Sequence, residues 1–519
     1  MSLIGRYGLY GGLLPLALYV GVMAIVARTY RRRPTRLVEL VAAMSVAATI
    51  SGLAVALASR GFAEIDPSTG QLFTAPVGLQ GHPNLSGAFL GMAVPSFAYL
   101  VLRSKGLWSR ALLVCGLALD LAALGTTRSR GGVLAAVCGL AVMAAALARP
   151  LSRRRALAVV GVGALAGAAL WSAWLQPTMR RAVDAPEGSS LLRAKTAQIR
   201  LWAWESAARA VADHPLFGAG PDTFDLVHPR YRGPLDGAYL GSRLTGKPHN
   251  VFLERAVDTG LPGGAGYVAL VGVALWRGVR RGRRLPRESR LVLACFAGTL
   301  AAYAAQGFVS FDTPNLAMPG WVALGAIAAV LDHHAADPYQ WEPTPPRRRT
   351  RLWTIPIAVG LVVVACVPAL ADIRFRVGDV ERARRLDPWE AIYPTAAANR
   401  ALAAAASAPS TGKEEALLRR ALDDYQAALR VQGPNVFPTT AIARTYTRWA
   451  QDIDPRRFAD AERWWQRAVG LDPRNGELRI EHAAMLSSWA SATGDERAAS
   501  GVRRERAAAA AAIAALRRR

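Results

Sequence analysis

Long apolar runs separated by short basic connections are the feature that most constrains how this chain can fold. A helix that crosses a bilayer needs about 20 consecutive, mostly apolar residues. The sequence therefore predicts an all-α fold, a polytopic transmembrane bundle of about ten helices. The predicted spans are residues 9–27, 40–59, 85–102, 111–127, 131–148, 156–175, 259–276, 291–311, 313–331 and 352–371.

Lys and Arg residues are concentrated in every second connection, and cytoplasmic connections are the ones that carry such an excess. The connections between them hold only Arg60, Arg128 and Arg130. This alternation predicts a multi-pass membrane protein with both chain ends and the long segment 176–258 extracytoplasmic. A further span near the N terminus would change the sidedness of that end alone. The basic connections are residues 28–36, 103–110, 149–155, 277–290 and 347–351.

The formal net charge of +26 would suggest nucleic-acid binding in a soluble protein. Here the charge lies between apolar spans, where it orients a membrane protein, so no nucleic-acid partner is expected. No cluster of His, Cys, Asp and Glu has metal-site spacing, and we predict neither a metal nor another cofactor. The cysteines are read as small buried apolar residues: Cys115, Cys138, Cys295 and Cys366.

The segment 176–258 is too long to be a simple connection, and loops of this length are usually functional unless they are disordered. A helix is predicted over 193–213, with Ile199, Trp202, Ala203 and residues 206–207 on one side. The His214-Pro215 pair ends this helix, because proline disfavours helix at the residue before it. Gly218-Ala219-Gly220-Pro221 predicts a tight turn.

Residues 372–519 contain no run long enough to span a bilayer and predict a second, helical domain after a transmembrane domain over 1–371. Its pattern is that of short helices broken at the proline-containing residues 387–388, 433–435 and 471–473. Segments 421–429 and 461–469 resemble the second helices of tetratricopeptide repeats, and Pro434 and Pro473 follow them about 39 residues apart. Stacked repeats form concave surfaces, so a protein partner is a possibility. A plain helical cap is the alternative. The final Ala- and Arg-rich stretch, 501–519, could rest on anionic headgroups.

Five short motifs follow one another in an order that resembles the O-antigen ligase/polymerase superfamily, which are membrane GT-C-type glycosyltransferases. Each motif alone is weak, and the order makes the resemblance specific. It covers roughly residues 40–331. The motifs are Gly81-His82-Pro83-Asn84, Thr127-Arg128-Ser129-Arg130-Gly131-Gly132, Arg200-Leu201-Trp202-Ala203-Trp204, residues 214–220 and His249-Asn250-Val251-Phe252-Leu253, followed by Gly260-Leu261-Pro262-Gly263.

The resemblance implies transfer of an undecaprenyl-diphosphate-linked glycan to an acceptor hydroxyl without a metal ion. The family's histidine falls on His249, which would act as general base. Its two arginines fall on Arg130 and Arg200, which would stabilise the departing diphosphate. Arg128 competes with Arg130 for this role, and spacing does not separate them.

Each residue also has a simpler interpretation. Arg130 could anchor a helix end at the headgroups, Arg200 could lie on a solvated helix face, and His249 could be an ordinary turn residue. His82 and His214 are interpreted as structural because a proline follows each.

Three further residues are possible supporting groups. Asn250 follows His249, and Trp202 could stack on sugar or pack the loop onto the membrane surface. An acid at membrane depth is a functional candidate, and we expect Asp120 to form an ion pair with Arg128 or Arg130.

Ligation to lipid A core, polymerisation of repeat units and transfer to protein share these motifs. A glycan, lipid or protein acceptor therefore remains open. The alternative function is a transporter or flippase for lipid-linked glycan. It would bind diphosphate through arginines but needs no general base, and the two related halves common in transporters are not seen.

Overall fold

The computed structural model describes residues 11–58, 64–65, 72–73, 78–148, 192–242, 244–335, 367–368 and 370–517. These residues are almost entirely α-helical. Two short strands, β1 (Glu64–Ile65) and β2 (Leu72–Phe73), pair antiparallel. The predicted span 156–175 and most of the predicted span 352–371 lie outside the described residues.

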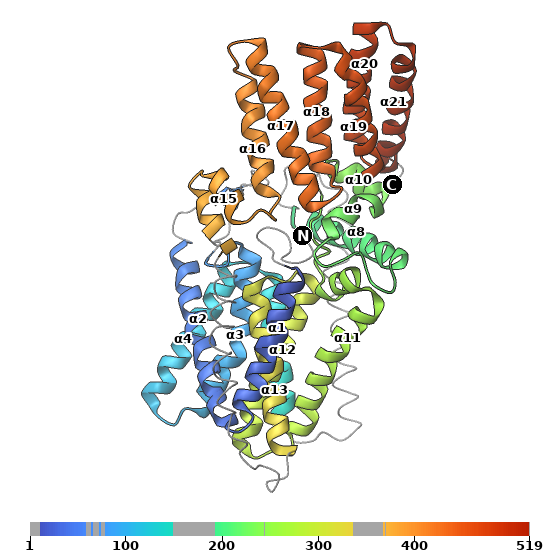
Figure 1. Ribbon diagram of the computed structural model, residues 1–519. Helices are drawn as coiled ribbons and strands as arrows, with labels where there is room; N and C mark the ends of the chain where they lie inside the picture. The colour runs from blue at the N-terminus through green and yellow to red at the C-terminus, as the bar shows by residue number, and fades with distance from the viewer. Residues whose placement is uncertain are drawn as a thin grey trace, which may run out of the picture.

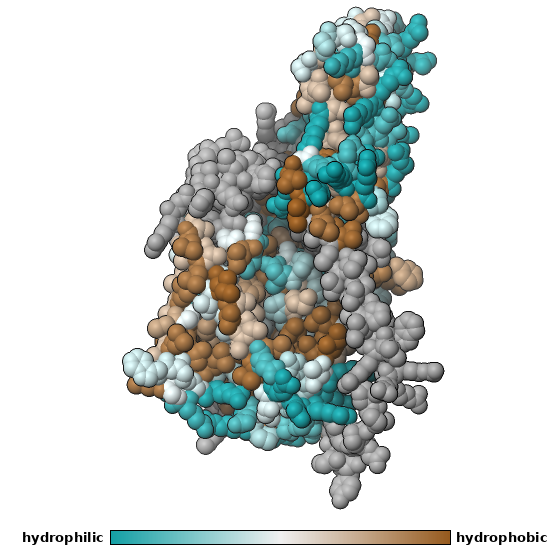
Figure 2. Space-filling view, turned by 60° about the vertical axis from the view of Figure 1, so that its left-hand side comes forward, coloured by the Kyte–Doolittle hydropathy of each residue, from teal (hydrophilic) through white to brown (hydrophobic). Residues whose placement is uncertain are grey.

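Eight described helices are long and apolar enough to cross a membrane. They correspond to eight of the ten predicted spans, and the predicted fold class, a polytopic helical membrane protein, is confirmed. Apolar side chains form a broad belt around this bundle, whereas polar side chains gather at its far end and on the C-terminal helices (Figure 2). The spans are α1 (Leu13–Tyr30), η1 (Pro34–Leu37) continuing into α2 (Val38–Ala58), α3 (Pro83–Arg103), α4 (Leu107–Thr126), α5 (Arg130–Leu147), α11 (Val251–Gly282), α12 (Arg287–Val309) and α13 (Pro314–Ala335).

The two ends of the bundle differ. Successive spans alternate in direction, so α3, α5, α11 and α13 begin at the end next to α8, α9 and α10, which we call the loop end (Figure 1). The connections at the opposite end include residues 31–33 and 283–284, all of them arginine. Among the short connections between described spans, the arginine-rich ones therefore lie at the end opposite the loop end.

The first turns of α3 and α5 pack backbone against backbone. A Cβ on Gly132 would lie 2.2 Å from the carbonyl oxygen of Gly87, and one on Gly91 would lie 2.2 Å from that of Gly132. Only glycine permits this approach, because any side chain would overlap the facing backbone. The contact brings the N termini of α3 and α5 together at the loop end.

The loop contains α8 (Leu192–Asp213), α9 (Phe224–Tyr231) and α10 (Pro234–Leu240). The prediction of a helix over 193–213 is confirmed by α8. Its buried face, which includes Ala203 and Ala207, packs against Val257 of α11.

A break in α11 joins this loop to the bundle. Gly260 has φ 75° and ψ −179° and interrupts the helix, with Pro262 following. The backbone groups freed by the break bond to the loop: Leu261 N donates to Pro215 O and Ala219 N donates to Val257 O, both at 2.7 Å. The motif at 214–220 and the break at 260–263 are thus held together by backbone hydrogen bonds, which attach the loop to the bundle.

The C-terminal helices stand on the loop end as successive hairpins (Figure 1). The chain breaks between helices where proline predicted it, at residues 387–388, 433–435 and 471–473. The tetratricopeptide assignment and the domain boundary at residue 371 stay predictions. The helices are α15 (Val380–Leu386), α16 (Ile392–Ala405), α17 (Thr411–Gln432), α18 (Val436–Asp452), η4 (Pro455–Arg457), α19 (Phe458–Leu471), α20 (Gly476–Thr493) and α21 (Glu496–Arg517).

One buried ion pair fastens the C-terminal helices to the loop. Arg232, just after α9, donates from Nε to Asp472 Oδ1 at 2.8 Å and from Nη2 to Oδ2 at 2.6 Å. Both side chains are fully buried. Arg474 also donates to the carbonyl oxygen of Arg232, and Glu477 accepts from Ser242 N at 2.8 Å.

Candidate active site

Three helices begin at the loop end with side-chain caps. Nδ1 of His82 accepts from Asn84 N at 3.1 Å at the start of α3, and Ser129 Oγ accepts from Gly132 N at 3.1 Å at the start of α5. Asn250 Oδ1 caps α11 by accepting from the first backbone amides, at 3.0 and 3.1 Å. Asn250, predicted as a supporting residue, is thus a helix cap. The N termini of helices carry partial positive charge and favour anions.

His249 lies directly before the cap of α11, in an uncommon backbone conformation. Its φ is 53°, the left-handed region that few non-glycine residues adopt. Its ring meets that of Phe311 edge to face, with centroids 5.1 Å apart. Burial, followed by the positive charges of Arg200 and His82, lowers the pKa of His249 to about 3. The imidazole is therefore neutral at physiological pH and able to accept a proton.

Arg200 lies in α8 and is partly buried. Its Nε is buried without a hydrogen-bond partner among the described residues. Burial and the positive charge of Arg130 lower the pKa of this guanidinium. Arg200 therefore interacts electrostatically with both Arg130 and His249. We call His82, Arg130, Arg200 and His249 the loop-end cluster.

The two arginines that spacing did not separate are both exposed, and they differ in their position at the start of α5. Arg130 is the first residue of α5, and its charge acts on Arg200. Arg128 is exposed in the preceding turn, at φ 53°. Thus the loop-end cluster contains Arg130, with Arg128 two residues away on the turn.

The tryptophans of α8 pack inward. Trp204 meets Phe308, near the end of α12, with ring centroids 5.5 Å apart in a T-shaped arrangement. Trp202 is partly buried, and its carbonyl oxygen accepts from Ser206 Oγ at 2.9 Å. The contact of Trp204 therefore joins the loop to the bundle. His214 is exposed, and its Nε2 lies 3.5 Å from Tyr231 Oη.

The expected ion pair of Asp120 is wrong. Asp120 is fully buried in α4, and among the described residues neither carboxylate oxygen has a hydrogen-bond partner. The prediction assumed that an arginine two turns along the chain would reach back to this acid. Instead Arg128 is exposed in the turn and Arg130 begins the next helix, where its charge acts on Arg200.

A buried ionic network beneath the loop-end cluster was missed by the sequence reasoning. Lys247 donates to both Asp222 and Glu254. The residue after Glu254, Arg255, pairs with Asp258 at 3.3 Å and with Asp312 at 3.5 Å. A local signal was present, since acidic and basic residues at 254, 255 and 258 lie within one turn at the start of a span. Their partners at 222 and 312 are distant in sequence.

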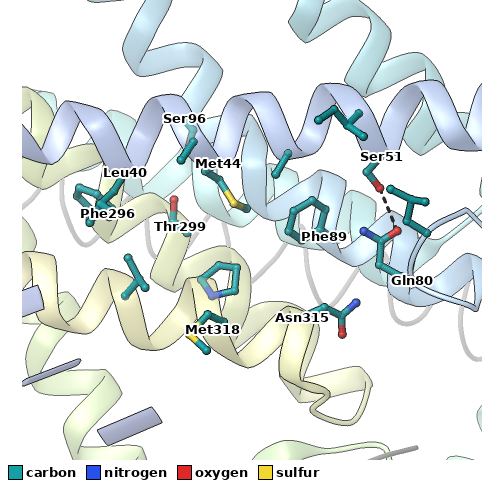
Figure 3. A pocket seen from close by; sticks show the side chains of 16 residues that line it. Leu40, Met44, Ser51, Gln80, Phe89, Ser96, Phe296, Thr299, Asn315 and Met318 are labelled. Carbon is teal, nitrogen blue, oxygen red and sulfur yellow. Dashed lines mark hydrogen bonds between the residues drawn. The ribbon is translucent and has the colours of Figure 1, made fainter. Parts of the chain in front are cut away.

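An apolar groove runs along the bundle between α2, α3, α12 and α13 (Figure 3). Its volume is about 530 Å³. Leu40 and Phe296 lie at one end, and Ser51, Gln80 and Asn315 lie toward the loop end. Gln80 Oε1 accepts from Ser51 Oγ at 2.9 Å and from Ser86 Oγ at 3.0 Å, and it precedes His82 by two residues. The groove suits an extended aliphatic chain whose polar end lies near the loop-end cluster.

The fold and this site define a polytopic helical membrane protein with a cationic cluster at one end of its bundle. Residues 115–268 match the family model of O-antigen ligases. This stretch contains Arg130, Arg200 and His249, and its match supports the O-antigen ligase/polymerase superfamily, a family of glycan transfer of the ligase or polymerase type. No curated protein matches the chain.

Proposed function

We propose that this protein transfers a glycan from an undecaprenyl-diphosphate donor to an acceptor hydroxyl, on the extracytoplasmic face of the bacterial plasma membrane. The observation that carries this proposal is the meeting of Arg130, Arg200 and His249 in one cluster at the loop end. These residues come from α5, α8 and the start of α11.

Arg130 and Arg200 hold the donor diphosphate. Burial lowers the pKa of Arg200, and the positive charge of Arg130 lowers it further, so the two guanidinium groups repel one another. An anion that lies between them relieves this repulsion. The helix N termini at Asn84, Gly132 and Phe252 add partial positive charge. Charge that develops on the leaving diphosphate is thereby stabilised without a metal ion.

His249 is the general base. Its neutral imidazole takes the proton of the acceptor hydroxyl while the acceptor oxygen attacks the anomeric carbon. The bond from that carbon to the diphosphate oxygen breaks, and undecaprenyl diphosphate leaves. Burial is the main cause of the lowered pKa of His249, and the charge of Arg200 lowers it further. The bound diphosphate offsets the charge of Arg200 and so raises the pKa of His249, which makes it a stronger base. Donor binding thus prepares the base.

The groove and the charge pattern agree with this reaction. The polyprenyl chain lies in the apolar groove, with its diphosphate at the loop end near Gln80. The arginine-rich connections at the opposite end support a cytoplasmic location for that end. The acceptor, whether glycan, lipid or protein, approaches from the side of the C-terminal helices.

The test is reconstitution in proteoliposomes with an undecaprenyl-diphosphate glycan and candidate acceptors. His249→Ala is expected to lose about 10²–10⁴ in rate, and Arg130→Ala and Arg200→Ala are expected to bind donor weakly. Arg128→Ala is the matched control, because it removes an exposed arginine two residues from Arg130. A chelator should have no effect. Release of undecaprenyl diphosphate at the wild-type rate by His249→Ala would refute the assignment. A glycan that changes leaflet with its lipid intact would instead indicate a flippase.

A further inference from the structure

We propose that Lys247 is a positioning residue for His249: its ammonium, held between two carboxylates, fixes the turn that carries the base. The proposal rests on the function proposed above. It concerns a residue that neither touches the donor nor belongs to the loop-end cluster.

The ammonium of Lys247 joins separate parts of the chain. It is 3% exposed and donates to Asp222, which follows the 214–220 motif, and to Glu254, in the first turn of α11. The other carboxylate oxygen of Asp222 accepts from Gly11 N at 3.1 Å, and Asp222 N donates to Asp258 Oδ1 at 3.0 Å. The clamp therefore ties the loop, the turn at 247–250 and the start of α11 to one point.

Only Pro248 separates this point from His249. The proline ring fixes φ near −65°, so little of the clamp's rigidity is lost across it. The left-handed backbone of His249 is costly for a residue with a Cβ and persists only where its surroundings enforce it. Lys247 enforces it from one side, and the cap made by Asn250 enforces it from the other.

The ring of His249 is held by the same network. It packs against Phe311, and the next residue, Asp312, accepts from Tyr303 Oη at 2.7 Å and pairs with Arg255. Arg255 lies beside Glu254, the second carboxylate of the clamp. The ionic groups that fix the backbone of His249 are therefore linked, through Arg255 and Asp312, to the residue against which its ring packs.

Lys247 suits this role rather than direct binding of the donor. Although burial alone would lower its pKa, Glu254 and Asp222 raise it, so the side chain stays an ammonium. Both carboxylates already bond to it, and the side chain is buried. Because two carboxylates neutralise this ammonium, it adds little to the affinity for diphosphate. Removing it instead releases the turn at 247–250.

The experiment uses the full chain in proteoliposomes and compares Lys247→Met/Glu254→Gln with wild type. This double substitution removes both ion pairs of Lys247 and leaves the net charge of the clamp unchanged, and the Asp222 carboxylate keeps its hydrogen bond from Gly11 N. We expect kcat to fall at least tenfold while KM for the donor changes less than about twofold, because Arg130 and Arg200 are intact. Lys247→Arg, which keeps the charge, should recover part of kcat. Arg209→Met, which removes a half-exposed loop cation paired with Glu205, is the control.

A second comparison separates positioning from general structural damage. If Lys247 acts through His249, adding Lys247→Met/Glu254→Gln to His249→Ala causes no further loss of the residual rate. An equal further loss in that background would overturn the proposal, as would a wild-type kcat in the clamp variant. If His249→Ala alone keeps the wild-type rate, the proposed function fails instead.

Discussion

The buried ion pair between Arg232 and Asp472 gives a quantitative test of how the C-terminal helices are attached. Burial raises the pKa of Asp472 even though Arg232 lowers it, so desolvation offsets much of the attraction. Removing the acid is a different matter, because Asp472→Ala leaves the Arg232 guanidinium fully buried without its counter-charge. The expected cost is about 3–5 kcal/mol.

The chain provides a matched control. Arg444 and Glu481 also form a two-bond pair, with both distances 2.7 Å, but their side chains are 52% and 37% exposed. Glu481→Ala is expected to cost about 0.2–1 kcal/mol. The two substitutions remove the same kind of contact, one buried and one exposed, and the exposed pair joins α18 to α20 within the C-terminal helices.

Hydrogen–deuterium exchange is the suitable assay, because it reports separately on α9, α10 and α20. For Asp472→Ala, protection at this contact should fall by about two orders of magnitude or more, since each 1.4 kcal/mol is tenfold. For Glu481→Ala, protection of α18 and α20, which the Arg444–Glu481 pair joins, should fall less than about fivefold. Equal effects of the two substitutions would show that burial does not govern this attachment, and the reasoning would be wrong.

Three further outcomes are expected. Gly132→Ala should lower the unfolding temperature of the detergent-solubilised protein by several degrees, because its Cβ would overlap backbone of α3. Gly131→Ala, whose Cβ would lie 3.5 Å from a valine methyl, should leave it unchanged. Asp120→Val should leave glycan transfer unchanged and raise that temperature, because it removes a buried acid that has no hydrogen-bond partner among the described residues. Loss of transfer in a stable protein would instead give Asp120 a role. Arg200→Gln should move the acid limb of kcat/KM to higher pH. Neutral His249 is the active form, and it is lost as the pH falls through the pKa of His249. Removing the nearby cation raises that pKa. If the acid limb of kcat/KM, measured with the residual activity of Arg200→Gln, does not move, His249 is not the titrating base.

The membrane-spanning architecture could be predicted from sequence because its signal is local. An apolar run and its basic flanks are read within about twenty residues, and eight spans were found in this way. The helix at 193–213 was similarly predictable, since its buried residues recur at helical spacing. Proline located the breaks in the C-terminal region for an equally local reason.

The arrangement of the candidate site depends on contacts that sequence spacing does not encode. The difference between Arg128 and Arg130 arises from a three-residue turn in which Ser129 caps α5. The clamp at Lys247 needs Asp222, which is 25 positions away. The ion pair of Asp120 was predicted because Arg128 and Arg130 are close to it in sequence. Closeness in sequence did not bring the side chains together, and neither carboxylate oxygen of Asp120 has a hydrogen-bond partner among the described residues.

The ordered motifs make physical sense once they are paired. A Cβ on Gly218 would lie 2.4 Å from Val257 O, and one on Gly132 would lie 2.2 Å from Gly87 O. Gly218 therefore contacts the backbone of α11, the helix that begins within the motif at 249–253. Gly132 contacts the backbone of α3, the helix that begins within the motif at 81–84. One contact sets α8 against α11, and the other sets the N termini of α3 and α5 side by side. The positions of Arg200 and Arg130 relative to His249 follow from these contacts. A chain that kept all three charged or basic side chains but lost either glycine contact would no longer bring them together.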